Sequence, residues 1–176
     1  MGVLSTIIKR GVTTDVLELL EAQHEEVDLL LENLKNNIGD RREQFLLLAD
    51  NLAAHATVEE KIFYPAVMAK ETGELLHESV EEHLAIKRVL ADMLEKQLDD
   101  DTFHAKLSVL EEQVSHHAHE EEEDNLFPKV KKLFSTDERA ALGNDVLAMF
   151  EELMKGHPSQ NVPAETTKAA PLPPQR

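Results

Sequence analysis

The sequence predicts an all-α protein: an up-down-up-down four-helix bundle with an additional C-terminal helix and a flexible, proline-rich tail. The first observation is the spacing of the apolar residues, mostly Leu, Ala and Val. They recur at alternating steps of three and four and so mark one face of a helix. The second is composition, since aromatic residues make up 4% of the chain and five of its seven prolines lie after residue 157. Such a composition favours helices over sheets.

Turn signals divide the chain into five predicted helices. The first ends before the turn at Asn37 and Gly39, the second ends near Gly73, and an acidic turn, DDDT, separates the third from the fourth. Ser135 followed by Glu138 has the spacing of a capping box and opens the fifth helix. The predicted helices cover residues 14–36, 40–70, 74–98, 102–134 and 135–155.

The length of 176 residues is that of a single domain. We expect one helical bundle over residues 1–156. Residues 157–176 are rich in Pro, Ala and Thr and poor in large apolar side chains, so we expect them to form a flexible C-terminal tail.

The net charge and the composition argue against several classes of binding partner. Asp and Glu outnumber Lys and Arg by 35 to 18, and the formal net charge of −17 would repel nucleic acid and anionic lipid. No apolar run reaches the length of a membrane span and no signal peptide is recognisable, so we expect a cytoplasmic protein without membrane contact. Because the chain has no cysteine, any metal must be bound through nitrogen and oxygen.

Each of the first four predicted helices interrupts its apolar stripe with a histidine. In the second and fourth helices a glutamate follows four residues later, and residues four apart lie on the same face. A carboxylate in a helical core needs a partner. The inward polar residues predicted in this way are His24, His55, Glu59, His83, His117 and Glu121.

These residues form an internal repeat. His24 is followed thirty-one residues later by the first His-x-x-x-Glu pair, and His83 is followed thirty-four residues later by the second. Two helical hairpins related by an approximate twofold axis would present four imidazoles and two carboxylates to one another. Imidazole and carboxylate without sulfur suit iron or manganese, and one carboxylate from each half could bridge two ions.

A simpler interpretation is that each inward histidine is an ordinary core residue. One such histidine usually is, but a duplicated set with two carboxylates would be costly to bury without a cation. Tyr64 is expected to be structural, on a different face from His55. The remaining histidines lie off the stripes or at helix ends and are expected to face solvent; they are His77, His104, His116, His119 and His157.

With these motifs, residues 14–150 resemble the hemerythrin-like HHE cation-binding family, which has a histidine on each of four helices and His-x-x-x-Glu on the second and fourth. The Phe63-Tyr64-Pro65 and Phe127-Pro128 motifs after the two pairs are part of the resemblance. It implies a non-haem centre of two iron ions, oxo- or hydroxo-bridged, that reacts with dioxygen, peroxide or nitric oxide. The ligands that it implies are His24, His55, Glu59, His83, His117 and Glu121.

The sequence departs from the oxygen carriers of that family. They have a fifth histidine four residues from the one on the third helix, where this chain has Ser79 and Lys87. We therefore expect peroxide breakdown or a role in oxidative or nitrosative stress, with catalase-like or peroxidase-like activity, and reversible oxygen binding or sensing as the alternative. A ferritin-like di-iron oxidase is a second alternative, through Glu21-x-x-His24 and Glu74-x-x-His77. A metal-free helical interaction module is a third.

The position of the second glutamate is ambiguous. Ten residues separate His55 from Pro65, but eleven separate His117 from Pro128. Counting back from Pro128 favours Glu122, whereas the apolar stripe favours Glu121. We expect Glu121 to face inward, with the extra residue absorbed as a π-bulge between it and Pro128, because such bulges occur near functional sites.

Overall fold

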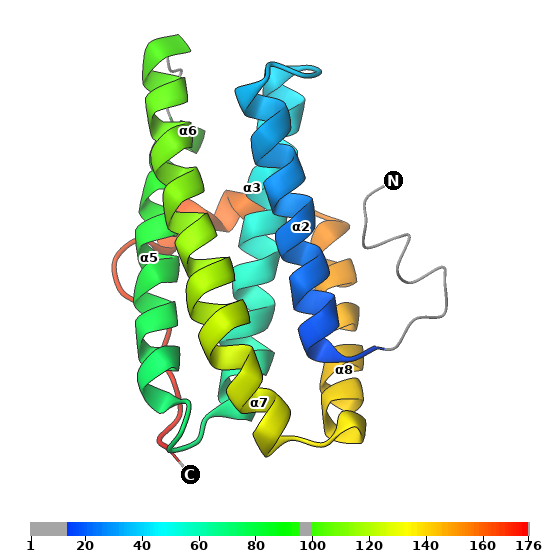
Figure 1. Cartoon of the computed structure of the whole chain (residues 1–176). Helices are drawn as coiled ribbons and strands as arrows, with labels where there is room; N and C mark the ends of the chain where they lie inside the picture. The colour runs from blue at the N-terminus through cyan, green and yellow to red at the C-terminus, as the bar shows by residue number, and fades with distance from the viewer. Residues whose placement is uncertain (1–13, 96–99, 176) are drawn as a thin grey trace.

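The computed structural model of the chain describes residues 14–95 and 100–175, and all regular structure within them is helical. Four antiparallel rods form the bundle, as predicted, and a further helix packs against the first two (Figure 1). The rods are α2 (Val16–Lys35); α3 (Arg41–Val58) continued by η1 (Glu59–Phe63) and α4 (Tyr64–Val67); α5 (Gly73–Glu95); and α6 (Asp100–Ser115) continued by η2 (His116–Leu126) and α7 (Phe127–Leu133). The further helix is α8 (Thr136–Met154), and the short 3-10 helix η3 (Pro158–Glu165) follows it.

Most of the predicted helix ends are confirmed by their caps. Asn37 and Gly39 have positive φ angles of 54° and 78° and form the turn between α2 and α3, where Gly39 avoids the strain that a side chain would bring. Ser135 and Glu138 form the predicted capping box at the start of α8. The fourth helix is already formed at Asp100, the first described residue after 99, whereas we expected it from Thr102. Residues 96–99, which include the predicted end of the third helix, lie outside the described part.

The apolar core has two halves with a polar layer between them. On α2, Leu20 belongs to one half and Val27 to the other, and His24 lies between them. On α3 the same two halves contain Leu52 and Val58, which flank His55. The histidine layer is therefore enclosed by apolar side chains at both ends, which keeps water away from it and strengthens its electrostatic interactions.

The C-terminal segment, which we expected to be a flexible tail, contacts the bundle in its described residues. η3 packs against α3 and α5. The Ser159 backbone N–H and hydroxyl donate to Asp50 Oδ1 at 3.1 and 2.6 Å, and Val162, only 1% exposed, completes one half of the core. Arg88 Nε donates to the Thr166 carbonyl at 3.0 Å. Composition missed this packing because it depends on a few scattered apolar side chains, Val162, Ala169, Ala170 and Leu172, and on hydrogen bonds.

We expect Val162→Ala to destabilise the protein by about 2 kcal/mol, because it removes two buried methyl groups and leaves a cavity. Thermal unfolding of the variant and the parent chain measures this effect. Val109→Ala is the matched control, since Val109 is 46% exposed. Equal melting temperatures for Val162→Ala and the parent would show that the C-terminal segment contributes nothing to stability.

Candidate metal centre

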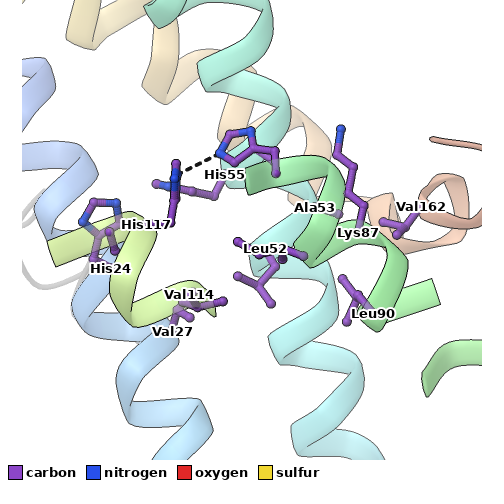
Figure 2. A pocket seen from close by; sticks show the side chains of 14 residues that line it. His24, Val27, Leu52, Ala53, His55, Lys87, Leu90, Val114, His117 and Val162 are labelled. Atoms are coloured by element: carbon purple, nitrogen blue, oxygen red, sulfur yellow. Dashed lines mark hydrogen bonds between the residues drawn. The ribbon is translucent and has the colours of Figure 1, made fainter. Parts of the chain in front are cut away.

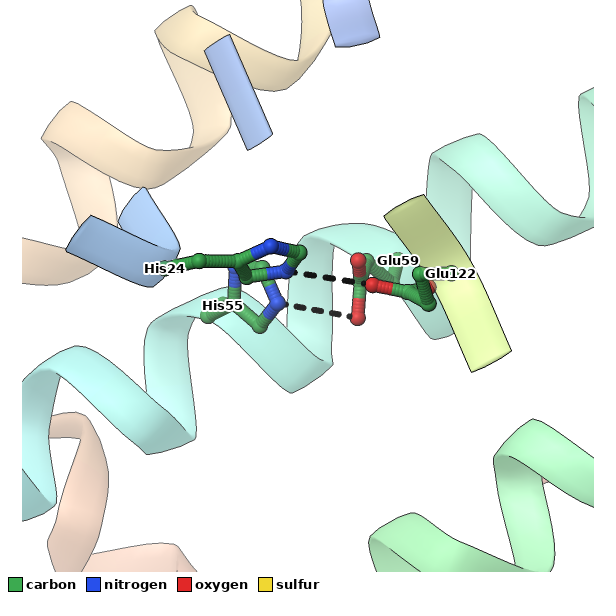
Figure 3. Close-up of side chains that lie close together, drawn as sticks. All are labelled: His24, His55, Glu59 and Glu122. Carbon is green, nitrogen blue, oxygen red and sulfur yellow. Dashed lines mark ion pairs between the residues drawn. The ribbon is translucent and has the colours of Figure 1, made fainter. Parts of the chain in front are cut away.

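Four histidines and two glutamates from all four rods of the bundle meet in the polar layer. Their potential ligand atoms form two groups that share Glu59, and within each group the atoms lie within 4.8 Å of one another. Figure 3 shows His24 and His55 pointing toward Glu59 and Glu122. All six side chains are buried. The first group is His24, His55, Glu59 and Glu122; the second is Glu59, His83 and His117.

The expectation that Glu121 faces the interior is wrong, and its neighbour takes that place. The side chain of Glu122 is fully buried, whereas that of Glu121 is 18% exposed and lies 3.9 Å from His116 Nε2. The cause is the π-helix η2, in which hydrogen bonds join residues five apart, so that Glu122 rather than Glu121 shares the face of His117. The expected π distortion is present, but it begins at His116, before the glutamates.

Tyr64 also lies in the cluster, contrary to the expectation that it lies on a different face from His55. The π-helix η1 brings it onto the face of Glu59, five residues earlier. Its hydroxyl donates to Glu122 Oε1 at 2.8 Å and lies 3.2 Å from Glu59 Oε2 and 3.3 Å from His83 Nε2. Burial, followed by the charges of Glu122 and Glu59, raises the pKa of Tyr64 well above its ordinary value, so the hydroxyl keeps its proton.

Each of the four imidazoles has an acceptor at Nδ1 on a neighbouring rod. An ionised carboxylate can only accept, so it holds the proton on Nδ1 and leaves the Nε2 lone pair facing the centre. Sequence reasoning missed these partners, although each is adjacent in sequence to a cluster residue. The pairs are His24 with Glu123 (2.7 Å), His55 with Gln23 (2.7 Å), His83 with Glu60 (3.0 Å) and His117 with Glu82 (2.7 Å).

Three atoms at the centre lack hydrogen-bond partners. His24 Nε2, Glu59 Oε1 and Glu122 Oε2 are buried and make no hydrogen bond. His24 Nε2 lies 3.1 Å from Glu122 Oε2, and His83 Nε2 lies 2.9 Å from His117 Nε2. Converging lone pairs of this kind require protons or a cation between them. The donor set of imidazole nitrogen and carboxylate oxygen fits a divalent or trivalent metal ion.

The pKa values show that the cluster favours positive charge. Burial disfavours the charged form of His24, yet Glu122 and Glu123 raise its pKa to about 9. For His117, burial is likewise outweighed by the carboxylates, and the pKa rises to about 10. Burial raises the pKa of Glu59, but the surrounding imidazoles hold it well below its ordinary value. Without a metal the cluster therefore takes up protons, for which a cation competes.

Three of the four residues in the Glu-x-x-His pairs of the ferritin-like alternative do not join the cluster, which contains only His24 of the four. Glu21 is half-buried, and Glu74 and His77 are exposed. The other histidines predicted to lie outside also do so: His116 and His157 are exposed, and His104 and His119 are half-buried. The cluster is therefore rich in histidine, unlike the carboxylate-rich site of the ferritin-like alternative.

The family comparison agrees with this geometry. The model of the hemerythrin HHE cation binding domain matches residues 15–130, which contain both hairpins and the whole cluster. The chain belongs to this family. As an HHE domain it is a cation-binding protein whose buried His and Glu side chains are suited to hold metal. No curated protein and no solved structure was found to match the chain.

Within residues 14–95 and 100–175 of this HHE domain, no helix combines the length and the apolar character needed to cross a membrane.

Proposed function

We propose that this HHE domain binds two iron ions and uses them to break down hydrogen peroxide. The observation that carries the proposal is the pair of ligand groups joined at Glu59, because a shared carboxylate is the usual means of holding two ions side by side. Nitrogen and oxygen ligands without sulfur suit iron. The proposed ligands are His24, His55, Glu59, Glu122, His83 and His117, with Glu122 in place of Glu121.

A small cavity beside the imidazoles supports a small substrate. Its volume is about 30 Å³, and all four cluster histidines line it. Figure 2 shows three of them, His24, His55 and His117. That volume holds about two water-sized molecules, enough for peroxide, dioxygen or nitric oxide but not for an organic substrate. The opposite wall is apolar and includes Leu52, Leu90 and Val162, so the cavity does not favour bulk water.

The positions at which oxygen carriers have a fifth histidine are occupied by residues engaged elsewhere. The Ser79 hydroxyl donates to the Leu75 carbonyl at 2.9 Å, and Lys87 Nζ lies 2.8 Å from Glu60 and 2.9 Å from Glu165. Four imidazoles and two carboxylates would supply about six to eight of the roughly twelve bonds that two octahedral ions accept. Open positions on both ions favour turnover of peroxide over reversible binding of dioxygen at one ion.

The surrounding residues are suited to this reaction. Bound iron would supply the redox chemistry, in which one peroxide is oxidised to dioxygen and a second is reduced to two waters. The Tyr64 hydroxyl holds a proton within hydrogen-bond distance of Glu59 and Glu122. Glu60 joins His83 Nδ1 to Lys87, so a proton can be exchanged between the cluster and the rim of the cavity.

The test is to add hydrogen peroxide to the iron-loaded full chain and follow oxygen evolution. We expect one dioxygen for every two peroxides consumed, and we expect Tyr64→Phe to slow the reaction at least about tenfold with unchanged iron content, because it removes a proton donor. Glu121→Gln is the matched control and should retain the full rate. Reversible uptake of dioxygen without consumption of peroxide would contradict the proposal and favour oxygen binding or sensing.

A further inference from the structure

The hydrogen bonds behind the four imidazoles follow the internal repeat, with one exception. His24 and His83, on the first rod of each hairpin, both donate to a glutamate that directly follows a cluster glutamate. His55 and His117, on the second rods, both donate to the residue directly before a first-rod histidine. For His117 that residue is Glu82, a carboxylate. For His55 it is Gln23, an amide.

The two partners lie at the same distance but differ in chemistry. Glu82 Oε2 and Gln23 Oε1 are each 2.7 Å from the Nδ1 that they face. An ionised carboxylate only accepts, so Glu82 permits the His117 form that carries hydrogen on Nδ1 and leaves Nε2 free for a metal. The amide of Gln23 accepts through oxygen and donates through nitrogen, so after a flip it satisfies the opposite tautomer equally well.

Burial makes this difference matter. Gln23 is 3% exposed, and its Nε2 has no hydrogen-bond partner, so the amide nitrogen does not hold the side chain in one orientation. A carboxylate behind a ligating imidazole also makes Nε2 more basic, which a neutral amide does not. His55 is therefore the cluster histidine that is least committed to binding a cation.

The remaining partners do not offset this asymmetry. Glu60 is shared between His83 and Lys87, and Glu123 is shared between His24 and His119. Each of these two carboxylates thus faces one further nitrogen group. Glu122 Oε2 lies 3.1 Å from His24 Nε2 and 3.8 Å from His117 Nε2, so it is within reach of both positions. Among the groups behind the imidazoles, the amide of Gln23 in place of a carboxylate is the clear difference between the two halves of the repeat.

We propose that the two cation positions are unequal: the position at His83 and His117 fills first and holds its ion tightly, whereas the position at His24 and His55 exchanges its ion. This inference rests on the proposed two-ion centre. It assigns Gln23 as the residue that weakens one position and Glu82 as the residue that strengthens the other. Both are positioning residues, since they act through an imidazole and touch no ion.

The experiment is an anaerobic calorimetric titration of the metal-free full chain with Fe²⁺, repeated with redox-inert Zn²⁺. The parent chain should bind two ions in two resolved steps. Gln23→Glu should tighten only the weaker step about tenfold or more, and Glu82→Gln should weaken only the tighter step by a similar factor, the size typical of such partners. In each variant, the rate at which Fe²⁺ is released to a coloured chelator should change only at the position whose affinity changes.

Two variants with the same charge changes serve as controls. Gln160→Glu adds a charge at an exposed position of η3, and Glu81→Gln removes one beside Glu82 on an exposed face of α5, so neither should alter the steps. Should Gln23→Glu fail to fold, Glu82→Gln still tests the ranking. Two indistinguishable steps in the parent, or variants that shift both steps equally, would overturn the inequality. A chain that takes up no ion would instead overturn the proposed metal centre.

Discussion

Replacing Glu122 with glutamine should lower the affinity of the chain for its metal at least about 100-fold, since loss of a direct ligand costs no less than loss of a residue behind one. Glu122 is fully buried, and its Oε2 makes no hydrogen bond although it lies 3.1 Å from His24 Nε2. The amide nitrogen of glutamine would present hydrogens to the ion in place of a lone pair. Element analysis after dialysis of the iron-loaded variant measures the loss.

The adjacent glutamate provides the control. Glu121→Gln removes the same charge one residue away, from a side chain that faces His116 rather than the cluster, and should bind metal like the parent chain. Circular dichroism of both variants establishes that the bundle is intact. If Glu121→Gln loses metal and Glu122→Gln retains it, the π-helical register of η2 is wrong.

Removing the metal should lower the melting temperature, and the decrease should grow as the pH rises from about 6.5 to about 9. The pKa of His24 is raised from 6.5 to about 9, and that of His117 to about 10. Groups with raised pKa values stabilise the folded metal-free protein below 6.5, and this contribution is lost as the pH rises through the folded pKa values. A bound cation supplies the positive charge throughout, so at pH 9 we expect a difference on the order of 10 °C.

Lowering the pH below about 4.5 should also destabilise the folded protein, through a different group. The pKa of Glu59 lies well below its ordinary value of 4.5, so its contribution to stability is present above 4.5 and is lost as the pH falls through the folded value. Protons also displace the metal from the imidazoles. Melting curves of chelator-treated and ferrous-loaded protein at pH 6.5 and 9 provide the measurement. An unchanged melt after verified removal of metal, or a difference independent of pH, would contradict this expectation.

The residues that face the bundle interior could be predicted from the sequence where the helices are regular. His24, His55, Glu59 and His83 lie where the spacing of three and four placed them, because α2, α3 and α5 keep the α-helical period and Glu59 is only the first residue of η1. Glu121 was misplaced because η2 changes the period to one with bonds between residues five apart. Comparison of the two halves contained the correct answer, since counting back from Pro128 indicated Glu122.

The hydrogen-bond partners of the imidazoles were missed because each side chain was assigned to solvent or core only from its position relative to the apolar face of its helix. A residue next to an inward one points about 100° around the helix, toward the neighbouring rod. Glu60, Glu82 and Glu123 occupy such positions and reach the imidazoles of other rods. The run of glutamates after His119 has the composition of a solvated face, and only packing shows that part of it supports the cluster.

Val162 lines the small cavity from a segment thirty-two residues beyond the last residue that the family comparison matches. The part of the chain that defines the family thus contains every proposed ligand, but not every wall of the chamber beside them. A chain shortened to residues 15–130 would keep the ligands and open the chamber to water. Exchanging the C-terminal segment between relatives is accordingly a way to change which small molecules reach the ions without altering a single ligand.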